Sequence, residues 1–506
     1  MLRPRRTRRS LRQGALALAL ALAAIGAVAG AESAARYVTY SEVRGLVAAS
    51  GSRAPRALTA LSESQREAFW PTWARQRDAG VRERVLRADE DSLAYLLVFG
   101  TSFTRAPRFT RLFLQESAQT IPGAASQIGG AVATERIREQ AFDARLADMV
   151  RALEAPGTDE RLAWARATLD RLGYRLDTAA GRTRASRYLL DNLSRVTKES
   201  ESLGARLKAS ESAGDRSAEL AARARLFAER ALASDTSWPI NFALAESLGA
   251  LAARTILPPR SVRRVAIVGP GLDFVDKDEG QDYYPPQSLQ PFAIIDALAT
   301  SGLSAGDALT VTTLDLSPRV NNHIRTFATR TSARPYDLQL VRTRDVRWTA
   351  AAAGYFDGFG AHVGRAVQAI VPPATAGNLE VRAVRVSPEW LRRIGPVDVD
   401  AVYQRLDVEE RELCDVVVAT NVLLYYDMFE QSLAIANLAH IMRPGAVLLT
   451  NTPLDDLPSF PLRRIGETAH AFSNRPGDGE YVFVYQKPDA VGGQAPPSGH
   501  RRAARR

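Results

Sequence analysis

The chain has 506 residues, of which 46% are hydrophobic and 24% charged, a globular composition too long for one compact core. Its net charge of +10 comes from the two ends, with six arginines in residues 1–31 and four in the last six residues, so the charge indicates no nucleic-acid-binding face. A single cysteine and five scattered histidines exclude an intramolecular disulfide and argue against a metal site.

Residues 1–31 have the pattern of a secretory signal peptide. A basic start precedes an apolar stretch, Gly14 to Gly30, and small-residue triplets predict cleavage after Ala29 or Ala31. The run "TRRSLR", residues 7–12, resembles a twin-arginine signal. We therefore expect an exported protein, periplasmic or secreted, with no membrane span after cleavage. The alternative is an uncleaved N-terminal anchor.

Residues 32–257 are predicted to form a mainly helical region. Apolar residues recur every three or four positions in Ala133–Ala155, and the pattern continues with many charges and alanines through residues 184–233. Two shorter apolar segments, residues 91–100 and 108–119, are interrupted by turn residues. No motif in this region indicates a reaction.

Residues 258–488 have a different pattern, which begins after "LPPR" at residues 257–260. Short β-rich runs alternate with helical segments, and a strongly periodic helix is predicted over residues 428–442. This alternation predicts an α/β domain with a mostly parallel sheet and helices on both faces. The predicted strands are residues 263–269, 308–316, 379–386, 414–426, 445–451 and 480–487. Residues 489–506 are rich in Gly, Pro and Arg and predict a disordered tail.

The first predicted strand of this domain ends in Gly269-Pro270-Gly271. Ligands of open α/β sheets bind outside the carboxyl ends of the strands, and glycines there allow the backbone to approach a ligand closely. The dinucleotide fingerprint requires Gly or Ala where this chain has Phe274, and no Gly-Lys-Ser/Thr follows for a phosphate loop.

The next predicted strand ends in Asp315, where a carboxylate can accept hydrogen bonds from two ribose hydroxyls. It lies 44 positions after Gly271, whereas the dinucleotide interval is about 20. The connection between them is acidic and favours a ligand with cationic groups over a pyrophosphate. Its acids are Asp273, Asp276, Asp278, Glu279 and Asp282.

The later stretch Cys414–Asn451 resembles the core of class I S-adenosylmethionine-dependent methyltransferases, nearest to the chemotaxis-receptor glutamate methyltransferase type. The resemblance rests on an Asp415-led apolar strand, the segment Asn421-Val422-Leu423 with Tyr425 and Asp427, a helix, and then Arg443-Pro444-Gly445. It covers residues 263–486, under half of the chain, and does not extend to the helical region.

The resemblance implies a set of site residues for S-adenosylmethionine. Gly269, Pro270 and Gly271, with Asp273 behind them, would flank its methionine part. Asp315 would hold the ribose, Asp407 would bind the adenine amino group, and Asn421 would line the reaction centre as the catalytic-site residue. The chain departs from the family's pattern at Ile267, where an acid is common, and at Thr420, where an arginine is expected.

We expect methyl transfer from S-adenosylmethionine to an unidentified acceptor. One alternative is a non-catalytic methyltransferase-fold binding or scaffold protein in the cell envelope, and another is a nicotinamide-dependent oxidoreductase. Each site residue also has a structural alternative, since Asp315 can cap the next turn, Asp407 can be an ordinary loop acid and Asn421 can satisfy backbone groups. The sequence indicates neither the acceptor nor an oligomeric state.

Overall fold

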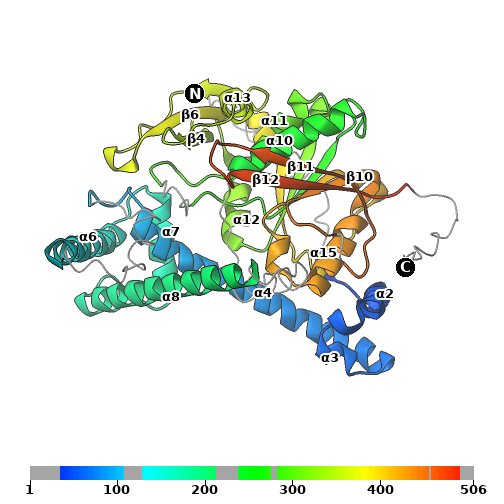
Figure 1. The fold of residues 1–506 in the computed structure, drawn as a ribbon, viewed down its shortest axis with the longest axis horizontal. Helices are drawn as coiled ribbons and strands as arrows, with labels where there is room; N and C mark the ends of the chain where they lie inside the picture. The colour runs from blue at the N-terminus through cyan, green and yellow to red at the C-terminus, as the bar shows by residue number, and fades with distance from the viewer. Residues whose placement is uncertain (1–34, 107–127, 212–237, 275–281, 455–456, 490–506) are drawn as a thin grey trace, which may run out of the picture.

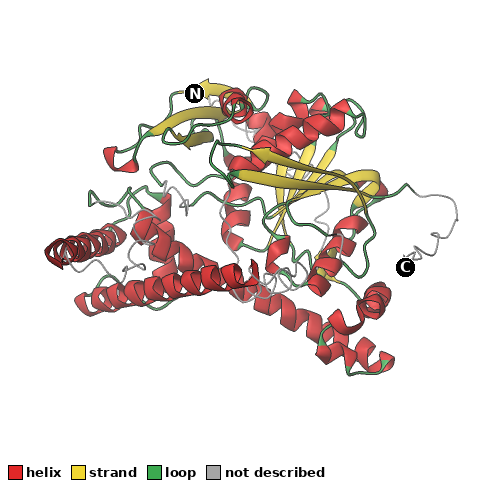
Figure 2. Cartoon of the chain, viewed as in Figure 1, coloured by secondary structure: helices red, strands yellow, loops and turns green. Residues whose placement is uncertain are grey.

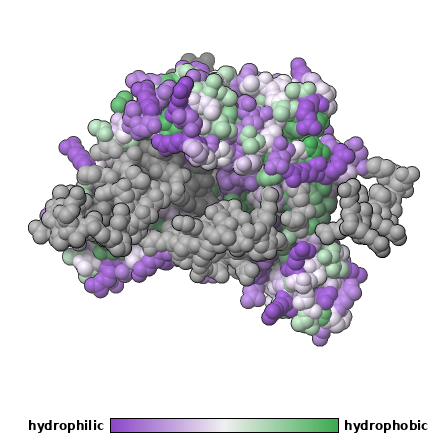
Figure 3. All heavy atoms as spheres, in the orientation of Figure 1, coloured by the Kyte–Doolittle hydropathy of each residue, from purple (hydrophilic) through white to green (hydrophobic). Residues whose placement is uncertain are grey.

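The computed structural model describes residues 35–106, 128–211, 238–274, 282–454 and 457–489 (Figure 1). The predicted signal peptide and nearly all of the predicted tail lie outside these ranges. No helix within them is long and apolar enough to cross a membrane. On the described part of the face in Figure 3, hydrophilic and hydrophobic side chains are interspersed.

The centre of the α/β domain is a seven-stranded sheet in the order β11-β12-β10-β9-β2-β3-β7 (Figures 1 and 2). From β10 to β7 neighbouring strands are parallel, whereas β12 is antiparallel to both β10 and β11. When the seven strands are numbered along the chain and read from β7 to β11, their order is 3-2-1-4-5-7-6. This is the strand order of the Rossmann-like methyltransferase fold. The strands are β2 (Arg264–Val268), β3 (Thr310–Asp315), β7 (Ile394–Asp398), β9 (Cys414–Ala419), β10 (Met442–Thr450), β11 (Arg463–Ala471) and β12 (Gly479–Gln486).

Helices cover both faces of this sheet, as predicted. Every residue of β9 is buried, which explains why its sequence is apolar apart from Asp415. Val417 packs on one face with α15 (Met428–His440), and Val416 and Val418 pack on the other. The helices α10 (Trp238–Ala253), α11 (Gln290–Thr300), α12 (Pro318–Arg325) and α13 (Ala350–Gly358) contribute to this second core.

A second sheet is inserted between β3 and β7, and it corrects one prediction. Residues 379–386 form a strand as predicted, but this strand, β6 (Leu379–Val386), belongs to an antiparallel sheet with β4 (Asp337–Thr343) and β5 (Gly364–Val367). Its sequence places charged Glu380, Arg382 and Arg385 between apolar residues. A central parallel strand is usually a continuous apolar run, so these charges argue against that position.

Two strands of the main sheet escaped prediction because their sequences are atypical. The strand β7 contains Gly395 and Pro396, and Pro396 is tolerated because β7 is an edge strand that pairs only with β3. The strand β11 carries charges and has an irregular register at Gly466.

The helical region consists of two parts joined by α4 (Glu63–Phe99). The first half of α4 and α2 (Tyr40–Ser50) pack on the α15 face of the main sheet, with Trp70 and Trp73 in that core. The second half of α4 forms a separate core with three helices (Figure 1). These are α6 (Ile128–Glu154), α7 (Glu160–Arg171) and α8 (Ala179–Glu211). Two short helices complete the description. Helix α3 (Arg56–Thr59) precedes α4, and helix α14 (Pro388–Leu391) precedes β7.

Both ends of the helical region share contacts with the α/β domain. The strand β1 (Ala35–Tyr37) pairs antiparallel with β8 (Gln404–Leu406). The helix α10 precedes the predicted boundary at residue 258 but packs in the core of the main sheet. The α/β domain is therefore assembled from chain segments on both sides of the helical region.

Candidate functional site

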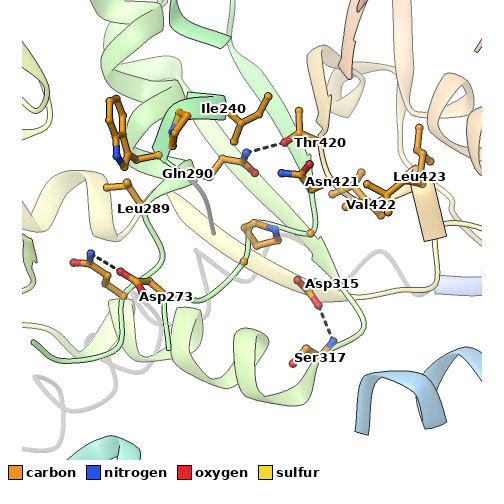
Figure 4. A pocket seen from close by; sticks show the side chains of 18 of the residues that line it. Ile240, Asp273, Leu289, Gln290, Asp315, Ser317, Thr420, Asn421, Val422 and Leu423 are labelled. Carbon is orange, nitrogen blue, oxygen red and sulfur yellow. Dashed lines mark hydrogen bonds between the residues drawn. The ribbon is translucent and has the colours of Figure 1, made fainter. Parts of the chain in front are cut away.

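A cavity of about 700 Å³ opens at the carboxyl ends of the parallel strands (Figure 4). The residues that follow β2, β3, β7 and β9 line it, so it lies where an open α/β sheet binds its ligand. Among the sequence-predicted site residues, the cavity brings together Gly269, Pro270, Gly271, Asp273, Asp315 and Asn421.

The glycine turn has the backbone conformation that the sequence suggested. Gly269 and Gly271 have φ angles of 64° and 72°, in the left-handed region. The Gly269 N–H donates to the Leu314 carbonyl of the neighbouring strand (2.9 Å). A Cβ atom on Gly269 would lie 2.6 Å from the Val422 side chain, so glycine is required here for space as well as for φ.

Asp315 ends β3 with its carboxylate toward the cavity, as Figure 4 shows. Its Oδ1 accepts a hydrogen bond from the Ser317 N–H (2.7 Å), and the Ser317 hydroxyl in turn caps α12 at Val320. Burial raises the pKa of Asp315 to about 7, and the nearby Asp398 carboxylate adds to this rise. The capping alternative is therefore real, yet it occupies only part of the carboxylate.

Asn421 follows β9 and has a φ of 57°, a conformation that asparagine tolerates better than most residues. It is locked to Asn451, which follows β10. The Asn421 N–H donates to Asn451 Oδ1 (2.9 Å), and Asn451 Nδ2 donates to Asn421 Oδ1 (2.6 Å). The paired amides join the ends of β9 and β10, and Asn421 lines the cavity.

Gln290, the first residue of α11, is a cavity residue that the sequence analysis missed. Its Nε2 donates to the Thr420 hydroxyl (3.0 Å), while its buried Oε1 has no hydrogen-bond donor among the described residues. Thr420 stands where the methyltransferase resemblance expects an arginine, and this bond gives it a defined role. Nothing in the local pattern around Gln290 marks it, because its role depends on a contact 130 positions away.

Two acids of the connection after the glycine turn have structural partners. Asp273 accepts hydrogen bonds from the Tyr284 hydroxyl (2.6 Å) and Gln287 Nε2 (3.1 Å) while lining the cavity. Asp282 is buried and accepts from the backbone and hydroxyl groups of Thr101 and Ser102, at the end of α4. Asp276, Asp278 and Glu279 lie outside the described residues.

The helical region holds this connection in place. The Arg161 guanidinium of α7 is buried and donates to the carbonyl oxygens of Phe274, Asp282 and Tyr284. Phe274 itself is buried against Trp164, with ring centroids 4.5 Å apart. The phenylalanine that departs from the dinucleotide fingerprint is therefore an anchor for the helical region.

Asp407 is not part of the cavity. It follows β8 on the surface, where its carboxylate accepts hydrogen bonds from Arg36 (2.6 Å to Nε) and its side chain is 55% exposed. The cavity lining contains no residue of the β8 segment, so Asp407 lies apart from the other predicted site residues. Residues that follow β7 line the cavity instead. We refer to the apolar lining residues Leu316, Val399 and Ala401, which follow β3 and β7, as the apolar slot.

Helix α4 borders the strand ends beside this slot. Asp398 pairs with Arg82 (2.9 Å). Asp400 is fully buried, and its Oδ1 accepts from the Val402 N–H (2.8 Å). Burial raises the pKa of Asp400 to about 8, and Asp78 of α4 adds to the rise. Val85 of α4 also lines the cavity, so this helix forms part of its wall.

The chemistry of the described lining fits a cationic nucleoside. The glycine turn offers close backbone approach, Asp315 a carboxylate and the apolar slot a surface for a base. Asp273 and Asp315 give this end of the cavity negative charge, which a sulfonium or ammonium would complement. No cluster of metal-ligating side chains occurs among the described residues.

No protein-family model and no curated protein matches the chain. Solved structures similar in part include N-methyltransferase NodS from Bradyrhizobium japonicum WM9, at 12% identity over 48% of this chain and 96% of that chain, with a TM-score of 0.25. TrmN from Thermus thermophilus is 15% identical over 49% of this chain and 48% of that one, with a TM-score of 0.23.

A third similar structure is magnesium protoporphyrin IX methyltransferase (ChlM) from Synechocystis PCC 6803 with bound SAM. It is 11% identical over 48% of this chain and 79% of that one, with a TM-score of 0.23. TM-scores this low say nothing about function. Any functional conclusion therefore rests on the strand order and on the residues of the cavity.

Proposed function

We propose that this chain is an S-adenosylmethionine-dependent methyltransferase. The observation that carries the proposal is the content of one cavity at the carboxyl ends of the sheet. A glycine turn with two positive φ angles, the Asp315 carboxylate and the amide-locked Asn421 follow the first, second and fourth parallel strands.

Each residue has a definite task in this proposal. Asp315 accepts hydrogen bonds from the ribose hydroxyls, and Leu316, Val399 and Ala401 pack on the adenine. The glycine turn admits the amino-acid part, whose ammonium group is attracted by Asp273. Transfer of a methyl group to a ready nucleophile requires alignment rather than acid–base catalysis, and Asn421 and Gln290 lie where the two reactants would meet.

The same features disfavour a nicotinamide dinucleotide. A pyrophosphate would sit at the N-terminus of a helix that follows the glycine turn directly. Here α11 starts 19 positions after Gly271, and its first side chain, Gln290, is bonded to Thr420. No lysine lines the described cavity, and its two arginines, Arg342 and Arg475, come from other elements.

The test is calorimetric binding of S-adenosylhomocysteine and S-adenosylmethionine, together with native mass spectrometry of the purified protein. We expect binding that Asp315→Ala abolishes and that Asp407→Ala leaves intact. Absence of binding to both compounds, in a protein with a cooperative thermal transition, would overturn the proposal and favour the non-catalytic binding or scaffold alternative.

We also propose that the chain is exported to the periplasm or secreted, on the basis of residues 1–31 alone. Mass spectrometry of the protein from cell fractions should find a mature chain starting after Ala29 or Ala31. Replacement of Arg8 and Arg9 by lysine should block export if the twin-arginine route is used. An intact Met1 in the membrane fraction would instead support the uncleaved anchor.

A further inference from the structure

One part of the cavity lining is rich in aromatic side chains. We call it the aromatic lobe and define it by Trp238, Trp348, Tyr355, Phe356, Phe359 and Phe472. These come from the start of α10, the segment after β4, α13 and the turn between β11 and β12. Gln290 and Ile240, both labelled in Figure 4, line the same cavity.

The aromatic rings form one connected cluster around Trp238. Its centroid lies 4.5 Å from Trp348, 6.5 Å from Tyr355 in a nearly parallel orientation, and 6.5 Å from Phe472. All four of these side chains are only partly buried. Open aromatic faces that line a cavity favour a planar, apolar or conjugated ligand.

Hydrogen-bond donors without protein acceptors lie in the same lobe. Arg342 is anchored by Glu380 (2.9 Å) and stacks on Phe356, but its buried Nη1 has no acceptor among the described residues. The Tyr355 hydroxyl is buried without a described partner as well. Arg475, in the turn between β11 and β12, lines the cavity and forms no ion pair with a described residue. Such donors call for a ligand with negatively charged oxygen atoms.

The lining offers few groups that could activate a protonated nucleophile. Among the described residues that line the cavity there is no histidine, lysine, cysteine or glutamate. Its three aspartates already accept hydrogen bonds, Asp273 from Tyr284, Asp315 from Ser317 and Asp478 from Ser473. An acceptor that already carries a free lone pair at neutral pH requires no further base.

Taken together, these observations define the acceptor. We propose that the aromatic lobe binds a planar aromatic oxyanion, a carboxylate or an acidic phenolate, as the methyl acceptor. The rings of Trp238 and Tyr355 hold its plane, and Arg342 and Arg475 bind its oxygens. This inference rests on the proposed methyltransferase function and adds the substrate class.

The transfer balances without a co-reactant. An oxygen lone pair of the acceptor forms the new carbon–oxygen bond to the methyl group. The carbon–sulfur bond breaks, and its electron pair stays on the sulfur, which becomes a neutral thioether. The oxyanion carries no proton, so no base has to remove one, in agreement with the lining.

The experiment uses the full mature chain saturated with S-adenosylhomocysteine and three naphthalene probes of the same shape. These are 2-naphthoate, the neutral 2-naphthamide and the cationic 2-naphthylmethylammonium. We expect calorimetry to show naphthoate binding about tenfold or more tightly than the amide, with the cation weakest. Arg475→Gln should weaken naphthoate binding about tenfold without changing the affinity for S-adenosylhomocysteine. Arg475 is exposed, so this variant should fold normally.

Arg344→Gln is the matched control. Arg344 is exposed, follows β4 and, like Arg342, lies near Glu380 (3.8 Å), but it does not line the cavity. It should leave naphthoate binding unchanged. If S-adenosylhomocysteine binds while naphthoate binds no better than the amide, the acceptor class is wrong and the methyltransferase proposal stands. If S-adenosylhomocysteine fails to bind, the methyltransferase proposal fails. In that case, Arg475-dependent binding of naphthoate to the free protein would still support an oxyanion site. Absence of this binding would overturn both the oxyanion site and the methyltransferase proposal.

Discussion

Replacement of Asp315 by asparagine should separate ligand binding from stability, with effects of opposite sign. The asparagine keeps the shape of the side chain and the acceptor for Ser317 N–H but loses the negative charge. Hydrogen bonds to a charged partner contribute about 1.5–3 kcal/mol each, and the remaining amide oxygen retains part of this. A loss of about 2–4 kcal/mol corresponds to S-adenosylhomocysteine binding roughly 30- to 1000-fold more weakly.

The pH dependence gives a second signature. Burial raises the pKa of Asp315 to about 7, so the carboxylate needed for the ribose is protonated below that pH. The affinity of the unmodified protein should fall about tenfold per pH unit below 7 and level off above it. The asparagine variant has no titrating group here, and its residual affinity should show no such slope.

Stability should change in the opposite direction. A carboxyl group whose folded pKa lies above its unfolded value of 3.8 contributes stability below pH 3.8, which is lost as the pH rises through 7. The full shift corresponds to ~4 kcal/mol, which partial exposure to solvent reduces to about 1–3 kcal/mol. The asparagine variant should therefore unfold at a higher temperature than the unmodified protein at pH 8, with the difference shrinking toward pH 5.

Titration calorimetry and thermal unfolding between pH 5 and 8.5 measure both effects on the same samples. The reasoning is refuted if the variant binds S-adenosylhomocysteine as tightly as the unmodified protein. It is equally refuted if the affinity of the unmodified protein is constant between pH 6 and 8.

Three further predictions follow from other contacts. Gly269→Ala should destabilise the fold by about 1–2 kcal/mol and abolish S-adenosylhomocysteine binding. The control is Gly302→Ala, because Gly302 has a similar φ of 71° but open space around it. This control should lower only the unfolding temperature. Asp407→Ala should change stability by less than about 1 kcal/mol and leave calorimetric binding unaltered, since its ion pair is exposed; a lost ligand affinity would restore its adenine role. Arg161→Leu should lower the free energy of unfolding, measured with a chemical denaturant, by about 3–5 kcal/mol, because three carbonyl oxygens lose their hydrogen-bond donor. Amide hydrogen exchange near Phe274 should become faster. Unchanged exchange would mean that α7 does not hold this segment.

The central part of the α/β domain was predictable because its signals are local. The apolar run of β9 and the periodicity of α15 each specify an element from a short stretch of the chain, and both elements were confirmed, although β9 ends at Ala419 and not at residue 426. The strand β7 was not predictable in this way, because Gly395 and Pro396 weaken its pattern and only its edge position makes the proline acceptable.

The candidate site shows the same division. Gly269, Asp315 and Asn421 follow strands whose ends meet at one edge of the sheet, so their proximity could be inferred from topology alone. Asp407 was assigned from the family resemblance and not from a strand end, and the structure places it after β8, outside the cavity lining. Gln290 depends on a tertiary contact with Thr420, and no short pattern in the sequence encodes it.

The pairing of β1 with β8 has a consequence for how the chain reaches its native state. Ala35 is aligned with Leu406, so the first described strand waits for a partner that is synthesised 371 residues later. Contacts this distant in sequence slow folding, since a long loop must close before they form. Until then the apolar side of α15 lacks the cover of Trp70 and Trp73. The chain therefore completes its fold only after nearly all of it has been made. A variant that lacks the residues before position 258 should aggregate and not fold.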